Sequence, residues 1–137
     1  MNGNNNFEHG KLGEYICATS LLRMGLSATL INLDTIDLIV NKDRKLIRVQ
    51  VKSSRHKLKD KNSNFRGYQF QTTYSGAKLP LTEDHCDVIA FVATDIEKVI
   101  FKPIKIFNNI TKRFAKQHFL KKDVEKVTWD ETMEAII

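Results

Sequence analysis

The stretch NLDTIDLIVNKDRKLIRVQVKSS, residues 32–54, decides the fold of this chain. Two runs rich in Ile, Val and Leu flank the short polar segment NKDRK, which is the composition of a β-hairpin. In the second run, apolar residues alternate with Arg48, Gln50 and Lys52. Side chains two residues apart on a strand share a face, so these three side chains are expected to form one polar face.

The turn sets which residues of the two strands lie opposite each other. With the turn centred between Asp43 and Arg44, Asp37 lies opposite Gln50 and diagonal to Lys52. The hairpin is therefore predicted to bring a carboxylate, an amide and an ammonium group together on one face.

A helix is predicted before the hairpin, over Phe7–Met24, because its apolar residues recur at helical spacing and Gly25 supplies a stop signal. Glu14 lies within this helix, and Gly10 and Gly13 lie about one turn apart on it. Glycine in a helix costs about 1 kcal/mol relative to alanine. The two glycines therefore predict a close approach of the helix backbone to a sheet or to a phosphate backbone.

After the hairpin, the pattern predicts several more strands and two helices. The strands are expected over Gly67–Tyr74, Asp87–Ala93 and Val99–Lys102, in addition to a short apolar entry at Ala28–Asn32. A helix is expected over Ile104–Phe119, and the pair Thr128 and Glu131 reads as a capping box that starts a terminal helix. The expected fold class is α/β (α+β), with a mixed β-sheet flanked by helices.

Composition restricts the class of protein and of partner. The chain of 137 residues is expected to form one domain, residues 1–137, of which residues 1–6 fray. With 22 Lys and Arg against 16 Asp and Glu, its net charge of +6 favours a polyanionic partner. Cys17 and Cys86 are too few for a disulfide framework. The sequence has neither a signal-peptide pattern nor an apolar run long enough for a membrane, so a cytoplasmic protein of a bacterial, archaeal or phage-infected cell, with no membrane partner, is expected.

The combination of Glu14 on a helix, Asp37 on one strand and Gln50-Val51-Lys52 on its partner resembles the PD-(D/E)XK nuclease superfamily. The segments GKLGEYICATSLLRMG and IDLIVNKDRKLIRVQVKSS match the αβββ core of that superfamily. There are two departures: Ile36 stands at the proline position, and Gln50 stands where Glu or Asp is usual. A Q-x-K variant in a small basic chain is similar to the homing endonucleases associated with group I introns.

The resemblance implies a restriction-endonuclease-like core and metal-dependent hydrolysis of phosphodiester bonds in double-stranded DNA. Mg²⁺, for which Mn²⁺ is expected to substitute, prefers oxygen ligands. The expected ligands are Asp37, the Gln50 amide oxygen and the Val51 carbonyl, while Glu14 binds through water or holds a second ion. Lys52 is expected to orient the attacking water or to stabilise the transition state.

Further residues are expected to contact DNA phosphates, because they are hydroxyl side chains at the end of the hairpin or basic side chains in the polar segment after it. They are Ser53, Ser54, Arg55, Lys57, Lys59, Lys61 and Arg66. Since one small domain offers one active site, cleavage of both strands predicts a homodimer or homotetramer.

Other interpretations of the same residues remain open at this point. Asp37 and Lys52 could form an ordinary cross-strand ion pair, a contact that contributes only about 0–1 kcal/mol, with Glu14 solvated on its helix. Within the nuclease class, a Holliday-junction resolvase or repair nuclease shares the fold and the metal. From another class, a DNA-binding module whose catalysis has lapsed fits the departure at Gln50.

Overall fold

The computed structural model describes residues 3–57, 66–73, 79–106 and 110–136 of the chain. Its helices are α1 (Gly3–Arg23), α2 (Lys116–Phe119), α3 (Val124–Ile136) and the short 3₁₀ helix η1 (Ile104–Ile106). Its strands are β1 (Ser27–Leu33), β2 (Ile36–Lys42), β3 (Lys45–Ser54), β4 (Tyr68–Gln71), β5 (Val88–Ala93), β6 (Lys98–Pro103) and β7 (Thr111–Phe114). No helix of the described part of the chain is long and apolar enough to span a membrane.

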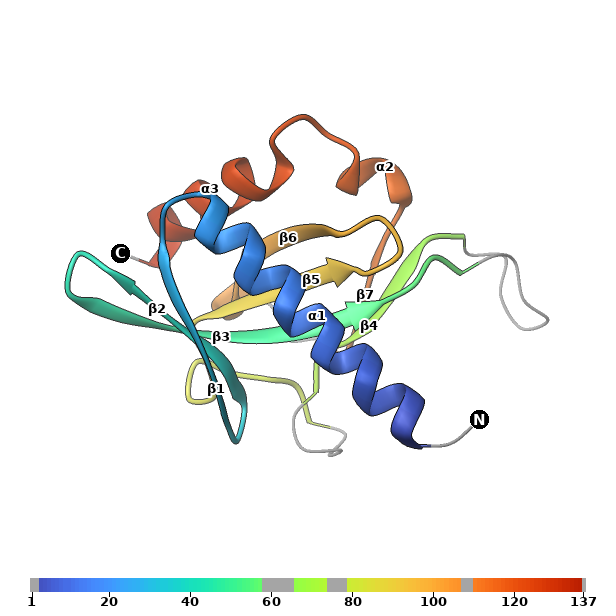
Figure 1. Ribbon diagram of the computed structural model, residues 1–137, viewed down its shortest axis with the longest axis horizontal. Coiled ribbons are helices and arrows are strands. Elements are labelled where there is room, and N and C mark those ends of the chain that lie inside the picture. The colour runs from blue at the N-terminus through green and yellow to red at the C-terminus, as the bar shows by residue number, and fades with distance from the viewer. Residues whose placement is uncertain (1–2, 58–65, 74–78, 107–109, 137) are drawn as a thin grey trace.

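Five strands form one mixed sheet in the order β1-β2-β3-β5-β6 (Figure 1). The central strand β3 pairs parallel with β5, and the other three pairs are antiparallel. A separate two-stranded antiparallel sheet pairs β4 with β7. The mixed sheet with flanking helices confirms the predicted fold class.

The hairpin of β2 and β3 has the predicted turn and register. Asp43 and Arg44 both have positive φ, 51° and 69°, which is the conformation of a two-residue type I′ turn. The pairs run from Lys42 with Lys45 to Leu38 with Val49, and continuing this register by one residue places Asp37 opposite Gln50.

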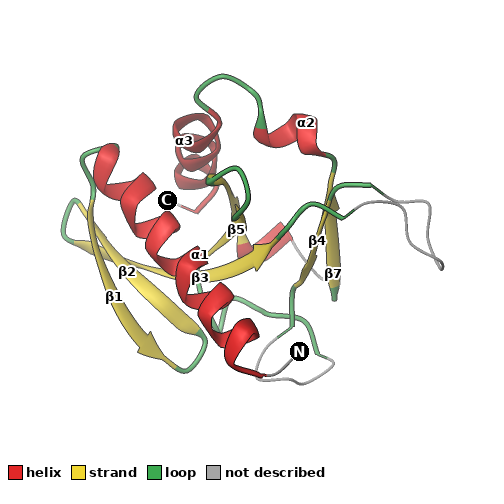
Figure 2. Cartoon of the chain, turned by 45° about the vertical axis from the view of Figure 1, so that its right-hand side comes forward, coloured by secondary structure: helices red, strands yellow, loops and turns green. Residues whose placement is uncertain are grey.

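The five-stranded sheet has an apolar core on each face. On one face α1 and α3 cover the sheet, and the core includes Leu21, Val49, Val88, Phe101 and Trp129. On the other face lie β4, β7 and α2, and the core includes Tyr68, Phe70, Phe91, Phe114 and Phe119. All six residues of β5 are buried, because the two cores cover this strand on both faces of the sheet. Figure 2 shows the β4–β7 pair standing apart from β1 and β2, at the other end of β3.

Gly13 sets how closely α1 approaches the sheet. A Cβ atom at this position would overlap Ser53 Oγ and lie 2.9 Å from Ser53 Cβ. The predicted close approach of the helix to a sheet is therefore correct at Gly13. At Gly10 a Cβ would meet nothing within 4 Å, so no packing contact explains that glycine.

The predicted helix over Ile104–Phe119 is wrong. The chain instead forms η1, then β7, then the four-residue α2, while residues 107–109 lie outside the described part. The apolar side chain of Phe114 enters the core from a strand, with ring centroids 5.1 Å from Phe91 and 6.0 Å from Phe70. The hydrogen bonds and packing gained when β7 pairs with β4 outweigh the local preference of these residues for a helix.

The predicted capping box is also wrong, because α3 begins before it. The Thr128 hydroxyl lies inside the helix, donates to the Val124 carbonyl over 2.7 Å and accepts from the Phe101 N–H over 3.0 Å. Thr128 thus joins α3 to β6 instead of starting the helix.

Candidate active site

Asp37 lies on β2 at the end of the hairpin opposite the turn, and the backbone of β3 holds its carboxylate. The Val51 N–H donates to Asp37 Oδ2 over 2.8 Å. Burial raises the pKa of Asp37 above its ordinary value, although the bond from Val51 and the charge of Lys52 oppose the rise. Because burial disfavours the negative charge of this half-buried carboxylate, a bound cation would stabilise the charge.

Gln50 has an acceptor oxygen that the described residues leave unsatisfied. Its Nε2 lies 3.4 Å from the Val51 carbonyl oxygen, whereas its buried Oε1 has no hydrogen-bond partner. A buried amide oxygen without a partner costs free energy, which a ligand at that atom recovers. The unsatisfied oxygen and the Val51 carbonyl are two of the metal ligands predicted from the sequence.

Glu14 is close enough to Asp37 for the two carboxylates to repel each other. Burial raises the pKa of Glu14, the charge of Asp37 raises it further, and Lys11, 3.4 Å away, lowers it. The close approach of α1 at Gly13 places Glu14 at the sheet. The structure therefore brings the carboxylate of the helix to that of the hairpin.

Lys52 is held on the same face of β3 as Gln50, two residues further along. Its Nζ donates to the Thr73 carbonyl over 2.8 Å. Burial lowers the pKa of Lys52, while the charge of Asp37 acts in the opposite direction. An ammonium with a fixed position and a partly desolvated charge is suited to act on a neighbouring anionic group.

The donor atoms fit a hard divalent cation better than zinc. The described ranges contain no group of three or more His, Cys, Asp and Glu residues that could hold a metal ion. The candidate ligands are instead the carboxylates of Asp37 and Glu14 and the amide oxygen of Gln50, with the Val51 carbonyl beside it. Oxygen donors of this kind suit Mg²⁺.

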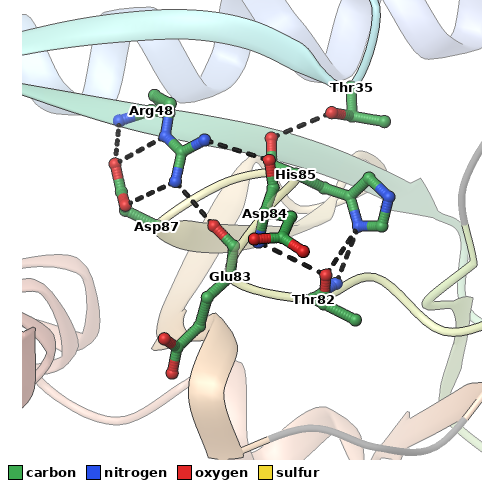
Figure 3. A network of polar contacts seen from close by, with 7 residues as sticks. All are labelled: Thr35, Arg48, Thr82, Glu83, Asp84, His85 and Asp87. Atoms are coloured by element: carbon green, nitrogen blue, oxygen red, sulfur yellow. Dashed lines mark hydrogen bonds and ion pairs between the residues drawn. The ribbon is translucent and has the colours of Figure 1, made fainter.

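Arg48 lies two residues before Gln50 and fixes the segment that precedes β5 (Figure 3). Its guanidinium donates to both carboxylate oxygens of Asp87, over 3.1 and 2.9 Å, and its backbone N–H donates to Asp87 Oδ2 over 2.8 Å. It also donates to the carbonyls of Glu83 and Asp84. A bidentate pair of this kind sets the orientation of both partners.

A second contact ties the same segment to the turn immediately before β2. The Thr35 hydroxyl donates to the His85 carbonyl over 2.9 Å, as Figure 3 shows. Thr35 stands two residues before Asp37, as Arg48 stands two residues before Gln50. The turn before β2 and the strand β3 are thus both anchored to residues 83–87.

The predicted DNA contacts fall into three groups. Arg55, Lys57 and Arg66 are exposed, as a phosphate contact requires. Ser53 lies against Gly13, and Ser54 is only 7% exposed and donates to the Arg55 carbonyl. Lys59 and Lys61 lie outside the described residues.

Sequence reasoning missed two partners of the site. Lys11 beside Glu14 was detectable, because residues three apart on a helix are neighbours. The Thr73 carbonyl that holds Lys52 was not, since a backbone acceptor carries no signal in the sequence.

Comparisons with known proteins identify a family and a similar solved structure. A family described as PD-(D/E)XK endonuclease matches residues 5–132. The structure of a bacterial homing endonuclease, I-Ssp6803I, is similar with a TM-score of 0.59 and 18% identity, over 78% of this chain and 72% of that one. At this identity the likeness shows the fold. Among curated proteins, none matches the sequence significantly.

Proposed function

The chain belongs to the PD-(D/E)XK endonuclease family, and on that premise we propose that it is a metal-dependent endonuclease of double-stranded DNA. The specific proposal is a homing endonuclease that cuts at one long site. It agrees with the net charge of +6 and with the likeness of the fold to a bacterial homing endonuclease.

The observation that carries the proposal is the group formed by Glu14, Asp37 and Gln50. Two carboxylates with raised pKa values lie close together, and the buried amide oxygen of Gln50 has no partner among the described residues. An ordinary cross-strand ion pair leaves no unsatisfied acceptor and needs no second carboxylate. A divalent cation offsets both features.

We propose Mg²⁺ as the ion, with Mn²⁺ able to replace it, since members of this family generally use divalent metal ions. Asp37, Gln50 and the Val51 carbonyl would hold it. Glu14 would supply the negative charge that is missing because residue 50 is a glutamine and not an acidic residue. The ion supplies charge that stabilises the phosphoryl oxygens and makes water a better nucleophile.

Lys52 acts on the phosphate or on the attacking water. Its bond to the Thr73 carbonyl limits where the ammonium can lie, so the charge is already placed when DNA arrives. Its half-buried position keeps this charge poorly screened. We therefore assign Lys52 to orientation of the water and stabilisation of the transition state.

The test compares two site variants with two surface controls. Asp37→Asn and Lys52→Ala should still bind duplex DNA, but their cleavage rates should fall at least ~100-fold. A loss of this size is typical when one electrostatic contact to the transition state is removed. The controls Asp130→Asn and Lys126→Ala change an exposed ion pair on α3 and should cleave normally. Full activity of either site variant, or of the wild type in EDTA, contradicts the proposal.

The choice of DNA substrate separates the related functions. A homing enzyme should cut one long site in a large duplex library, whereas preference for four-way junctions would identify a junction-resolving nuclease. Salt-dependent binding without any cleavage, by both the wild type and Gln50→Glu, would identify a DNA-binding module.

We also propose that the active form contains two or four copies of the chain, because one set of site residues cuts one strand. Sedimentation of the protein with and without duplex DNA measures the assembly. A monomer that cuts both strands in a single binding event would contradict this part of the proposal.

A further inference from the structure

We propose that the outward face of the β4–β7 ribbon reads base edges in the major groove of the DNA. This inference rests on the proposed function and extends it, because it assigns the residues that select the target sequence. The ribbon consists of Tyr68–Gln71 and Thr111–Phe114, paired antiparallel.

The register of the ribbon gathers its polar side chains on one face. Gln69 pairs with Arg113, and Gln71 pairs with Thr111. Paired residues share a face, and so do residues two apart on one strand, so these four side chains form one outward patch. Gln71 and Arg113 are exposed, and Gln69 and Thr111 are partly exposed.

The opposite face of the ribbon is buried and anchors it to the protein. Tyr68 and Phe70 are 0% and 1% exposed, and Phe114 packs against the ring of Phe119 at a centroid distance of 5.7 Å. Tyr68 also donates its hydroxyl to the Asp95 carboxylate over 2.9 Å. The outward patch therefore stands on a rigid base, which sequence readout requires.

The ribbon lies directly beside the candidate active site. Lys52 donates to the carbonyl of Thr73, two residues after the end of β4. Phe70 of β4 packs on Phe91 at 5.0 Å between centroids, and Phe91 is the register partner of Lys52 on β5. We therefore place the bases next to a phosphate at Lys52 against the ribbon.

The chemistry of the patch matches the donor and acceptor pattern of the major groove. A major groove admits a two-stranded β-ribbon, in which arginine recognises the O6 and N7 atoms of guanine and glutamine recognises N6 and N7 of adenine. Arg113 Nε donates to Gln69 Oε1 over 3.1 Å, a contact that orients the guanidinium. Strands of four residues cover roughly 13 Å, about the rise of four base pairs.

The experiment is selection from a randomised duplex library, read by cleavage in Mg²⁺ and separately by binding in EDTA. The wild type should show strong preferences at a short cluster of positions. Gln71→Ala and Arg113→Ala should each lose about 10- to 100-fold of the preference at one or two of these positions and keep the others. Arg23→Ala removes an exposed arginine from α1, on the other side of the sheet, and should keep the whole profile.

Modified bases then test which groove is read. Replacing the preferred guanine by 7-deazaguanine removes the major-groove N7 acceptor. This change should weaken the wild type and leave Arg113→Ala unchanged, because the variant has already lost the contact. An equal loss in both proteins would contradict a contact from Arg113 to that atom.

The outcomes separate this inference from the proposed function. Cleavage with no base preference, or a profile unchanged in both ribbon variants, overturns the inference and leaves the nuclease. Sequence-selective binding that the ribbon variants lose, without cleavage by the wild type, supports the inference and overturns the nuclease. Melting curves of the variants should match the wild type, since the changed side chains are exposed.

Discussion

The backbone N–H of Val51 donates to Oδ2 of Asp37 over 2.8 Å, so the strand that carries Gln50 and Lys52 also holds the carboxylate of its neighbour. The bond joins the two strands beyond the last ladder pair, Leu38 with Val49. The backbone of β3 therefore fixes the position of the Asp37 carboxylate, in addition to the rotamer of the Asp37 side chain.

This bond predicts different stabilities for two neutral variants of Asp37. Asparagine keeps an oxygen that accepts from the Val51 N–H, whereas alanine leaves that donor without its partner. Asp37→Ala should therefore unfold about 1–2 kcal/mol more easily than Asp37→Asn in EDTA, while both lose metal-dependent cleavage. Urea unfolding and a cleavage assay measure the two effects, and equal stabilities would show that the bond contributes nothing.

Gly13 predicts a steric effect with a matched control. Gly13→Ala should destabilise the fold by about 1–3 kcal/mol and lower the cleavage rate, because the new methyl group overlaps Ser53 and pushes Glu14 away from the sheet. Gly10→Ala meets open space in the same helix and should stabilise it by roughly 0.5–1 kcal/mol. Thermal unfolding of the two variants provides the comparison.

Relief of the overlap gives a second test of the same contact. Ser53→Gly removes the two atoms closest to a Cβ at position 13 and leaves Val51 Cγ1 at an ordinary contact distance of 3.6 Å, so the double variant should regain part of the stability lost in Gly13→Ala. Purely additive losses in the double variant would mean that Ser53 is not the obstacle.

Asp87 predicts a stability difference that depends on pH. Burial alone would raise the pKa of Asp87, but the hydrogen bonds from Arg48 hold it below its usual value. Stabilisation by a carboxylate with a lowered pKa is present above its unfolded pKa, about 4, and is lost as the pH falls through the folded value. The wild type should therefore be more stable than Asp87→Asn at pH 7, and the difference should shrink below about pH 4.

Chemical denaturation at pH 7, 5 and 3 measures this difference. The control is Asp130→Asn, which removes an exposed aspartate on α3. Its effect on stability should stay small throughout, because exposed ion pairs contribute little. A difference for Asp87→Asn that is constant with pH would exclude the ionised pair as its source.

The two cysteines predict low chemical reactivity in the folded protein. Cys17 and Cys86 are both fully buried, and burial raises the pKa of Cys86 to about 12. Iodoacetamide at pH 8 should modify neither thiol in the native state and both in urea. Mass spectrometry reads the result, and rapid native modification of Cys86 would mean that the segment before β5 opens in solution.

The hairpin and its residues could be predicted because all of their information is local. A two-residue turn at Asp43 and Arg44 fixes the register, and the register places Asp37 opposite Gln50. The alternation of apolar and polar residues in β3 then selects the face. Glu14 could be assigned to the site only from the resemblance to a family, because its distance from Asp37 depends on how the helix packs on the sheet.

The contacts that hold the site in place could not be predicted in the same way. The Thr73 carbonyl lies 21 residues from Lys52, and Asp87 lies 39 residues from Arg48. Neither pair has a pattern that selects it over many other acceptors. The same cause explains the error over Ile104–Phe119, where pairing with distant β4 imposes a strand on residues with helical spacing.

The parallel pairing of β3 with β5 has a consequence for how the site assembles during folding. The β2–β3 hairpin pairs residues that are close in sequence, whereas the pairing of β3 with β5 brings Val88 next to the distant residue Val49. Local contacts form with a smaller loss of chain entropy than distant ones. We therefore expect the pair of Asp37 and Gln50 to form early on a folding chain and the support of Lys52 at Thr73 to form late. Under the proposed function, the metal ligands Asp37 and Gln50 would then be in place before Lys52 is fixed, so a chain still folding would gain metal binding before it gained the ability to cut DNA.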